Sequence, residues 1–185
     1  MSKRVLVGVA DGTEELEAVT IIDVLRRAEL DVVVASVAPG HEVACSRGVH
    51  LVADRLIGEC LEEQWDAVVV PGGMPGASNL ADNEAFVSLL NKHNDANRLI
   101  GAICAAPKVV LASHGLLDGR SATAYPGFRE ELEQFGAVPS DDAVVLDGNI
   151  ITSQGPGTAM QFALALVTKL CGEEVSHKVA DGLLV

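Results

Sequence analysis

The chain has 185 residues, with 13 Lys and Arg against 26 Asp and Glu, and a formal net charge of −13. A surface this acidic repels phosphate backbones and anionic lipid headgroups, so we expect no nucleic-acid binding through a basic face and no membrane attachment. Hydrophobic residues make up 49% of the chain, which is enough for a core that needs neither disulfides nor metals. We expect one domain over residues 1–185.

The N-terminus and the cysteines favour a cytoplasmic protein. Only a short apolar run, residues 5–10, precedes Asp11, and it is too short for the core of a signal peptide. The sequence contains no CxxC pair, so each cysteine is expected to be a free thiol in a reducing compartment. It also lacks the HxH and HExxH spacings of metal sites, so no metal is expected.

Short apolar strands alternate with amphipathic helices along the chain. In chain order the patterns predict a strand at 4–10, a helix at 14–28, a strand at 31–38, a hairpin of 41–46 and 49–54, a strand at 65–73, a helix at 83–94, a strand at 98–104, a helix at 105–113, two strands within 143–153 and a helix at 157–171. This alternation is typical of an α/β fold with a mostly parallel sheet covered by helices on both faces.

In such a sheet, ligands bind outside the carboxyl ends of the strands. Three predicted strand ends carry unusual residues, namely segments 11–17, 71–76 and 103–107. We therefore expect these three segments to converge.

Cys104 is the first candidate for chemistry, because it stands between a predicted strand and the helix predicted at 105–113. A sharp strand-to-helix turn presents its side chain outward, as in a nucleophile elbow. The free N–H groups of the following helix would stabilise a thiolate and lower the pKa of the thiol to about 3.5–7.5. The alternative is a small buried apolar residue at a tight junction.

Gly72 and Gly73 follow the strand predicted at 65–73. Glycine lets backbone N–H groups approach a ligand, so beside Cys104 this pair could form an oxyanion hole. An ordinary turn at the end of a strand explains the two glycines equally well.

Two glutamates at the start of the first helix compete for the role of proton donor. Glu17 shares a stripe with Ile21 and Val24, which would bury its carboxyl and raise its pKa. Glu15 lies on a comparable stripe, so periodicity does not choose between them. The five histidines (His41, His50, His93, His114 and His177) do not adjoin these strand ends, and we expect surface or structural roles for them.

Five segments together resemble the ThiJ/PfpI superfamily, and within it the parkinsonism-associated protein deglycase branch and its bacterial relatives. They are KRVLVGVADGTEELEAVTIIDVLRRA (3–28), CSRGV (45–49), DAVVVPGGMPGA (66–77), IGAICAAP (100–107) and TSQGPGTA (152–159). The resemblance covers nearly the whole chain. It implies a flavodoxin-like α/β fold with a small β-hairpin, and a homodimer.

The resemblance also assigns roles to individual residues. It implies that Cys104 is the reactive cysteine and that Glu17 is the protonated acid hydrogen-bonded to its thiolate. The remaining implied site residues are Gly72, Gly73 and Ala105 at the oxyanion site, Glu14 as a second acid near the pocket, Ser153 and Pro156 in the loop that closes it, and Arg27 and Arg47 at the dimer interface close to it.

The implied activity is that of a cofactor-independent enzyme with a cysteine nucleophile. It would act as a glyoxalase III-type enzyme on methylglyoxal and glyoxal, or as a deglycase on their early protein and nucleotide adducts, and so protect against glyoxal and oxidative stress. The alternative is a redox-sensing stress protein or chaperone whose Cys104 is oxidised to a sulfinate. Both hypotheses use the same residues.

Three positions depart from the family pattern. Ala105 stands where peptidase and amidotransferase relatives carry a histidine, which disfavours a Cys-dependent amidase or peptidase. Tyr125 stands where some members carry a histidine. Glu29 replaces a glycine after the first helix, which would alter the cap of that helix.

Overall fold

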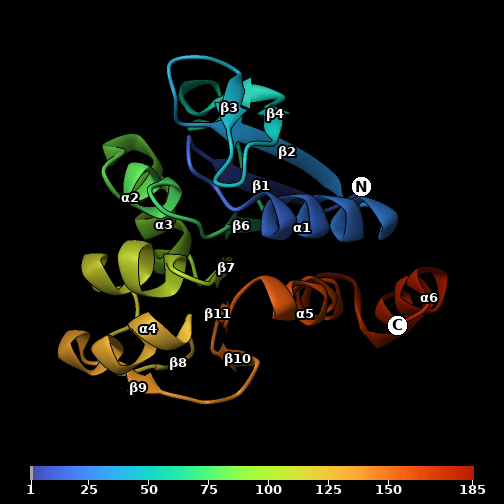
Figure 1. The fold of residues 1–185 in the computed structure, drawn as a ribbon. Helices are drawn as coiled ribbons and strands as arrows, with labels where there is room; N and C mark the ends of the chain where they lie inside the picture. The colour runs from blue at the N-terminus through green and yellow to red at the C-terminus, as the bar shows by residue number, and fades with distance from the viewer. Residues whose placement is uncertain (1) are drawn as a thin grey trace.

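The computed structural model describes residues 2–185, and a seven-stranded sheet runs through its centre (Figure 1). The strand order is β10-β11-β7-β6-β1-β2-β5. The strands are β1 (Arg4–Val9), β2 (Asp31–Ser36), β5 (Arg55–Leu56), β6 (Ala67–Val70), β7 (Leu99–Ile103), β10 (Val144–Asp147) and β11 (Ile150–Ser153). Every pair is parallel except β10 with β11.

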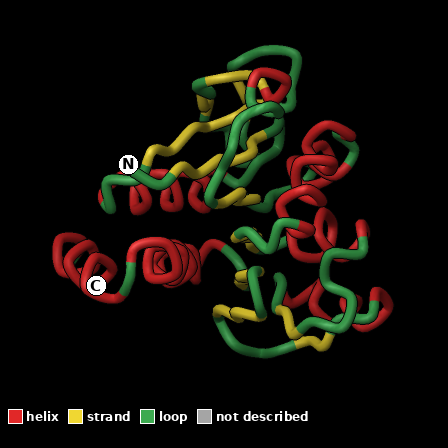
Figure 2. Tube along the Cα trace, turned by 180° about the vertical axis from the view of Figure 1, so that it is seen from behind, coloured by secondary structure: helices red, strands yellow, loops and turns green. Residues whose placement is uncertain are grey.

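Helices cover both faces of this sheet (Figures 1 and 2). One face packs against α1 (Glu15–Arg27), α5 (Ala159–Cys171) and α6 (Glu173–Leu183). The other packs against α2 (Gly76–Ala81), α3 (Glu84–Asp95) and the helical turns that follow β7. The central strands are apolar on both sides because both faces are buried. This arrangement confirms the predicted flavodoxin-like α/β fold.

The predicted hairpin is also present, as β3 (Glu42–Ala44) paired antiparallel with β4 (His50–Val52). Nine elements were not predicted. Three of them, α2, β5 and α6, belong to the sheet or to the helices that cover it. The other six are short, namely η1 (Ile57–Glu59), β8 (Ser121–Ala122), α4 (Pro126–Arg129), η4 (Glu130–Phe135), β9 (Val138–Pro139) and η5 (Pro156–Thr158). Most of them have too few residues to show a period. Among the helices of residues 2–185, none is long and apolar enough to cross a bilayer.

The helix predicted at 105–113 has a different form. Residues Pro107–Leu111 are a π-helix, η2, and Ala112–His114 form a 3₁₀ turn, η3. These forms are short and wound differently from an α-helix. Glu29 adopts φ 60° after α1, the left-handed conformation that usually takes glycine at a helix end.

Candidate functional site

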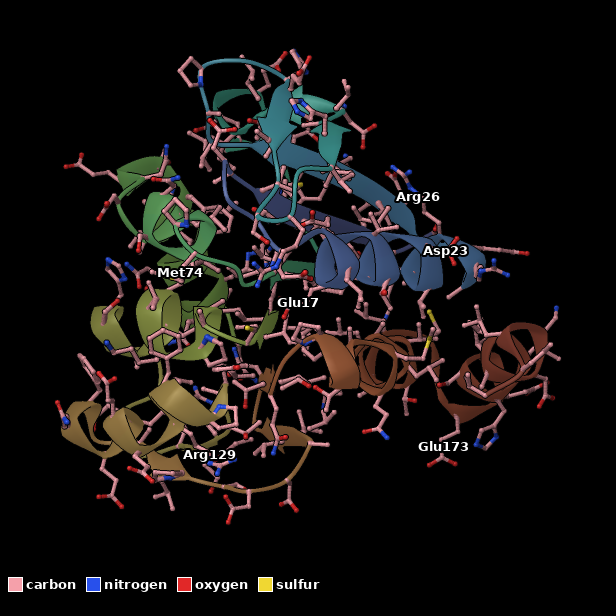
Figure 3. All side chains as sticks on the ribbon, in the orientation of Figure 1. Glu17, Asp23, Arg26, Met74, Arg129 and Glu173 are labelled. Carbon is pink, nitrogen blue, oxygen red and sulfur yellow. The ribbon has the colours of Figure 1, made fainter. Side chains whose placement is uncertain are left out.

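Cys104 and Glu17 meet at Gly72, beyond the carboxyl ends of β1, β6 and β7. A Cβ atom on Gly72 would lie 2.6 Å from Cys104 Cβ and 2.9 Å from Glu17 Oε2. Only glycine therefore fits between the two side chains. Figure 3 shows Glu17 reaching from α1 toward this junction. The predicted convergence of the three strand ends is confirmed.

Cys104 has the backbone conformation of an elbow residue. It follows β7 directly and adopts φ 66°, which costs about 1–2 kcal/mol for a residue with a Cβ. Two hydrogen bonds hold this conformation. The Cys104 N–H donates to the Ser153 carbonyl at 3.0 Å, and the Tyr125 N–H donates to the Cys104 carbonyl at 2.8 Å. The Cys104 side chain is partly exposed, so the turn presents a thiol that a small molecule can reach.

Glu17 is fully buried, with 0% of its surface exposed. The Gly72 N–H donates to its Oε2 at 2.8 Å, whereas its Oε1 has no hydrogen-bond partner. Burial raises the pKa of Glu17 to about 7, and the Gly72 N–H and Cys104 only partly oppose this rise. The carboxyl can therefore gain or lose a proton near neutral pH.

Cys104 differs from the prediction in its acidity. Burial is the main cause that raises its pKa to about 12, and the charge and hydrogen bonding of Glu17 act in the same direction. Hydrogen bonds from the N–H groups of Gly73 and Ala105 lower the pKa, but by less. The predicted lowering is wrong because burial beside a carboxylate outweighs the backbone dipoles.

The two groups therefore titrate as a pair. Two negative charges in one buried site repel each other, so near neutral pH the pair carries at most one. When that charge is on the carboxylate, the Gly72 N–H stabilises it. When it is on sulfur, the N–H groups of Gly73 and Ala105 stabilise it. Formation of a thiolate near neutral pH therefore requires that the thiol proton move to the Glu17 carboxylate.

Glu15 is buried as well, with 8% of its surface exposed, which explains why periodicity did not separate it from Glu17. Its carboxylate accepts hydrogen bonds from Ser46 Oγ and from the N–H groups of Arg47 and Val49. Burial opposes ionisation, but these hydrogen bonds outweigh it and lower the pKa of Glu15. Glu15 therefore anchors the β3-β4 hairpin to α1 and does not face Cys104.

Glu14 and Gly73 shape the backbone around the pair. Glu14 Oε2 accepts a hydrogen bond from the Glu17 N–H at 2.8 Å and caps α1. Gly73 has φ 90° and packs against the backbone of Gly12 and Glu14, where a Cβ would clash. Both residues therefore serve the geometry of the site through backbone contacts.

Ser153 is the last residue of β11, and Pro156 lies in the loop that follows it. Ser153 Oγ donates to the Ala143 carbonyl at 2.7 Å and lies 2.7 Å from Thr158 Oγ1. Pro156 opens the short helix η5. These contacts hold the loop, and they place Gly155 next to the sulfur of Cys104. Sequence reasoning missed Gly155, although it lies within one of the quoted segments.

Arg27 and Arg47 are exposed in the single chain. Arg27 Nε pairs with Asp23 at 2.7 Å, and the Arg47 backbone N–H donates to Glu15. Within residues 2–185 neither guanidinium hydrogen-bonds to Cys104 or Glu17, so the chain alone does not bring them to the site.

The structure shows no metal centre among residues 2–185, since no three His, Cys, Asp or Glu side chains are placed to hold an ion there. Four histidines are exposed, and His93 lies on the buried face of α3. The four cysteines are free thiols.

Comparisons with known proteins identify the family of the chain. The DJ-1/PfpI family pattern matches residues 3–169. The chain is 46% identical to protein DJ-1 homolog B of Arabidopsis thaliana over 98% of its own length, and it spans 41% of that relative. It is 43% identical to protein dj-1beta of Drosophila melanogaster, covering 100% of this chain and 98% of the relative.

A solved structure and an enzyme are also similar to the chain. The structure of Toxoplasma gondii DJ-1, oxidized, aligns with a TM-score of 0.95 at 45% identity, over 99% of this chain and 98% of that one. The glutathione-independent glyoxalase DJR-1.2 of Caenorhabditis elegans is 36% identical over 94% of this chain and 91% of the relative. The elbow cysteine, its buried glutamate and these similarities together show that the chain belongs to the DJ-1/PfpI family.

Proposed function

We propose that the protein is a cofactor-independent glyoxalase that converts methylglyoxal to lactate, with Cys104 as nucleophile. The observation that carries the proposal is the buried pair of Cys104 and Glu17, separated by the space that Gly72 leaves free. Hydrogen bonding from Gly73 and Ala105 toward the sulfur supplies donors for negative charge. The similarity to a glutathione-independent glyoxalase supports the choice of substrate.

In the first step, the sulfur forms a bond to the aldehyde carbon of methylglyoxal. The thiol proton moves to the Glu17 carboxylate, and the carbonyl electrons move to oxygen. The N–H groups of Gly73 and Ala105 stabilise that oxyanion. Glu17 passes its proton to that oxygen, which gives a hemithioacetal and restores the carboxylate.

In the second step, the Glu17 carboxylate removes the proton from the former aldehyde carbon. The electrons of the broken C–H bond move toward the ketone oxygen, which takes up a proton, and an enediol forms. Glu17 then returns its proton to the former ketone carbon, the hydroxyl on the sulfur-bearing carbon loses its proton, and the product is a lactoyl thioester. Water then cleaves the C–S bond, releasing lactate and restoring the thiol. A carboxyl with a pKa of about 7 suits both directions of proton transfer at neutral pH.

Mutation of the pair tests the mechanism. We expect Cys104→Ser and Glu17→Gln each to abolish the formation of lactate from methylglyoxal. An enzymatic lactate assay measures this activity. Cys171→Ser is the matched control, because Cys171 is also partly exposed but lies at the far end of α5. Activity like that of the unmodified protein in Cys104→Ser would refute the nucleophile.

The same chemistry would allow deglycation of early glyoxal adducts on proteins and nucleotides. An adduct prepared in advance, incubated with the enzyme while free glyoxal is trapped, separates the two activities. Adduct loss that depends on Cys104 under these conditions supports a deglycase. Loss only without the trap indicates consumption of free glyoxal.

A second candidate function is redox sensing, with Cys104 oxidised to a sulfinate. Two peroxide molecules each transfer one oxygen to the sulfur and leave as water. The similar Toxoplasma gondii DJ-1 structure is of the oxidized protein, and a protonated Glu17 could donate a hydrogen bond to a sulfinate oxygen. Mass spectrometry after mild peroxide treatment should find two added oxygens on Cys104; addition only at Cys45, Cys60 or Cys171 would exclude the sensor.

Amide or peptide hydrolysis is the least supported activity. Such an enzyme needs a histidine beside the nucleophile, and the neighbouring residue is Ala105. Inactivity on casein and fluorogenic peptides is the expected result. The free thiols fit a reducing compartment, and we place the activity in the cytoplasm.

We further propose that the protein acts as a homodimer. Four large apolar side chains of α1 and the β3-β4 hairpin are exposed, namely Leu16 (52%), Val19 (46%), Val49 (47%) and Val52 (74%). Hydrogen bonds to Glu15 hold the hairpin beside α1, so these side chains form one surface. A second copy would cover it and bring Arg27 and Arg47 into the interface.

A further inference from the structure

Tyr125 and Gly155 flank the sulfur of Cys104, outside the Cys104–Glu17 pair. Tyr125 is 48% exposed and stands between β8 and α4. Its backbone N–H donates to the Cys104 carbonyl at 2.8 Å, so the backbone of Tyr125 is tied to the elbow. The ring extends from this anchored backbone and stays accessible.

A hypothetical Cβ atom placed on Gly155 shows how much space lies between the Tyr125 ring and the Cys104 sulfur. Such an atom would lie 3.4 Å from Tyr125 Cδ2 and 3.9 Å from Cys104 Sγ. Both distances are ordinary van der Waals contacts. Among residues 2–185, apart from Gly155 itself and its chain neighbours Gln154 and Pro156, no other atom comes within 4 Å. Glycine therefore leaves open a position where one carbon of a ligand can touch the ring and the sulfur together.

We propose that Tyr125 is the specificity-determining residue of the Cys104 site. Its ring contacts the substituent R of a 2-oxoaldehyde, R–CO–CHO, while the sulfur adds to the aldehyde carbon. This inference rests on the proposed function. Aromatic rings prefer apolar and aromatic partners, so the site selects methyl and especially phenyl substituents over hydrogen.

The charges around the sulfur favour the same selectivity. Glu17 lies on the inner side of Cys104 and shares its negative charge with the thiol. A carboxylate in the substituent would add a second negative charge next to this pair. Within one chain the position beside Tyr125 is formed by an aromatic ring and a glycine, which suit a neutral apolar group.

The test compares kcat/KM for phenylglyoxal and glyoxal in the unmodified protein and in three variants. We expect Tyr125→Ala to reduce the phenylglyoxal-to-glyoxal ratio about 3- to 10-fold, mainly through a higher KM for phenylglyoxal. Tyr125→Phe should keep the ratio, because the ring and not the hydroxyl makes the contact. Leu146→Ala, which removes an exposed apolar side chain on β10, is the control and should leave the ratio unchanged.

A second measurement does not depend on catalysis. Mass spectrometry follows the alkylation of Cys104 by phenacyl bromide and by iodoacetamide. Tyr125→Ala should lower the rate ratio of the aromatic to the non-aromatic reagent, and Gly155→Ala should slow both reagents, because its methyl group fills the open position.

The two measurements separate the two hypotheses. If the protein consumes no oxoaldehyde but the alkylation ratio falls in Tyr125→Ala, the proposed function fails and the role of the ring survives. Unchanged ratios in both assays, or an equal loss for aromatic and non-aromatic reagents, would overturn the role of Tyr125.

Discussion

The Gly72 N–H donates to one oxygen of the buried Glu17 carboxylate at 2.8 Å, and the other oxygen has no partner. One hydrogen bond is too little to compensate for complete burial of a carboxylate. The pKa of Glu17 is therefore raised to about 7. A carboxyl in this state can act as acid and as base in one catalytic cycle.

The first prediction concerns the pH dependence of catalysis. Because the Glu17 carboxylate accepts the thiol proton, lactate formation should rise as the pH increases through about 7. Cys104 alkylation by iodoacetamide should follow the same profile, and in Glu17→Gln this inflection should disappear. An inflection that persists in Glu17→Gln would assign the titration to another group.

The same shift predicts the effect of Glu17 on stability. The folded-state pKa lies above the unfolded value, so the folded state binds the proton more tightly. This contribution to stability is complete below about pH 4.5 and is lost as the pH rises through about 7. As the pH rises from about 4.5 through 7, the free energy of unfolding of Glu17→Gln should therefore increase relative to that of the unmodified protein, by up to about 3 kcal/mol. Urea unfolding at each pH measures this difference.

The second prediction concerns the strained backbone of Cys104. A residue at φ 66° carries a steric cost that glycine does not. Cys104→Gly should therefore unfold with a free energy about 1 kcal/mol higher than Cys104→Ala, while both lack lactate formation. Cys171→Gly should instead be less stable than Cys171→Ala, because Cys171 lies in the helix α5.

The third prediction concerns stability in acid. His93 is 2% exposed and its Nε2 has no hydrogen-bond partner. Burial, with the charge of Arg98, lowers its pKa to about 4. Its contribution to stability is thus complete above about pH 6.5 and is lost as the pH falls through about 4.

Replacing His93 by Gln should remove this dependence of stability on pH. In the unmodified protein it amounts to a loss of about 3 kcal/mol in the free energy of unfolding as the pH falls from about 6.5 to about 4. Urea unfolding between pH 4 and pH 7 measures it. His177→Gln is the control, since His177 is exposed on α6. An equally steep loss of stability in His93→Gln would show that another group is responsible.

The fourth prediction concerns the apolar surface of α1 and the hairpin. A charge at Val52 or Leu16 would be buried against a second copy, and the complex should dissociate. We expect Val52→Glu and Leu16→Glu to be monomeric by light scattering coupled to size-exclusion chromatography. Val138→Glu, at an exposed position (58%) on β9, should leave the dimer intact. Dimers in all three variants would place the interface elsewhere.

The sequence by itself determined the order of the elements and the position of the elbow. Alternating apolar runs and helical stripes are local patterns, and they predicted the main strands, the hairpin and the turn at Cys104. Helix α6 was missed although Val175, Val179 and Leu183 recur at a helical spacing. The π-helix after Cys104 was not predictable, because helical periodicity does not separate the two helix types.

Periodicity left Glu15 and Glu17 open, and the family resemblance implied Glu17. Only the tertiary structure shows the contacts that separate the two glutamates and decides how acidic the thiol is. Glu15 and Glu17 are both buried, and they differ in their surroundings: hairpin N–H groups lower the pKa of one, and burial with a single such group raises that of the other. The raised pKa of Cys104 and the open space beside Tyr125 likewise depend on atoms brought together by distant segments. Local patterns set where a residue stands along the chain, but its proton affinity depends on the charges and hydrogen bonds that the folded chain places around it.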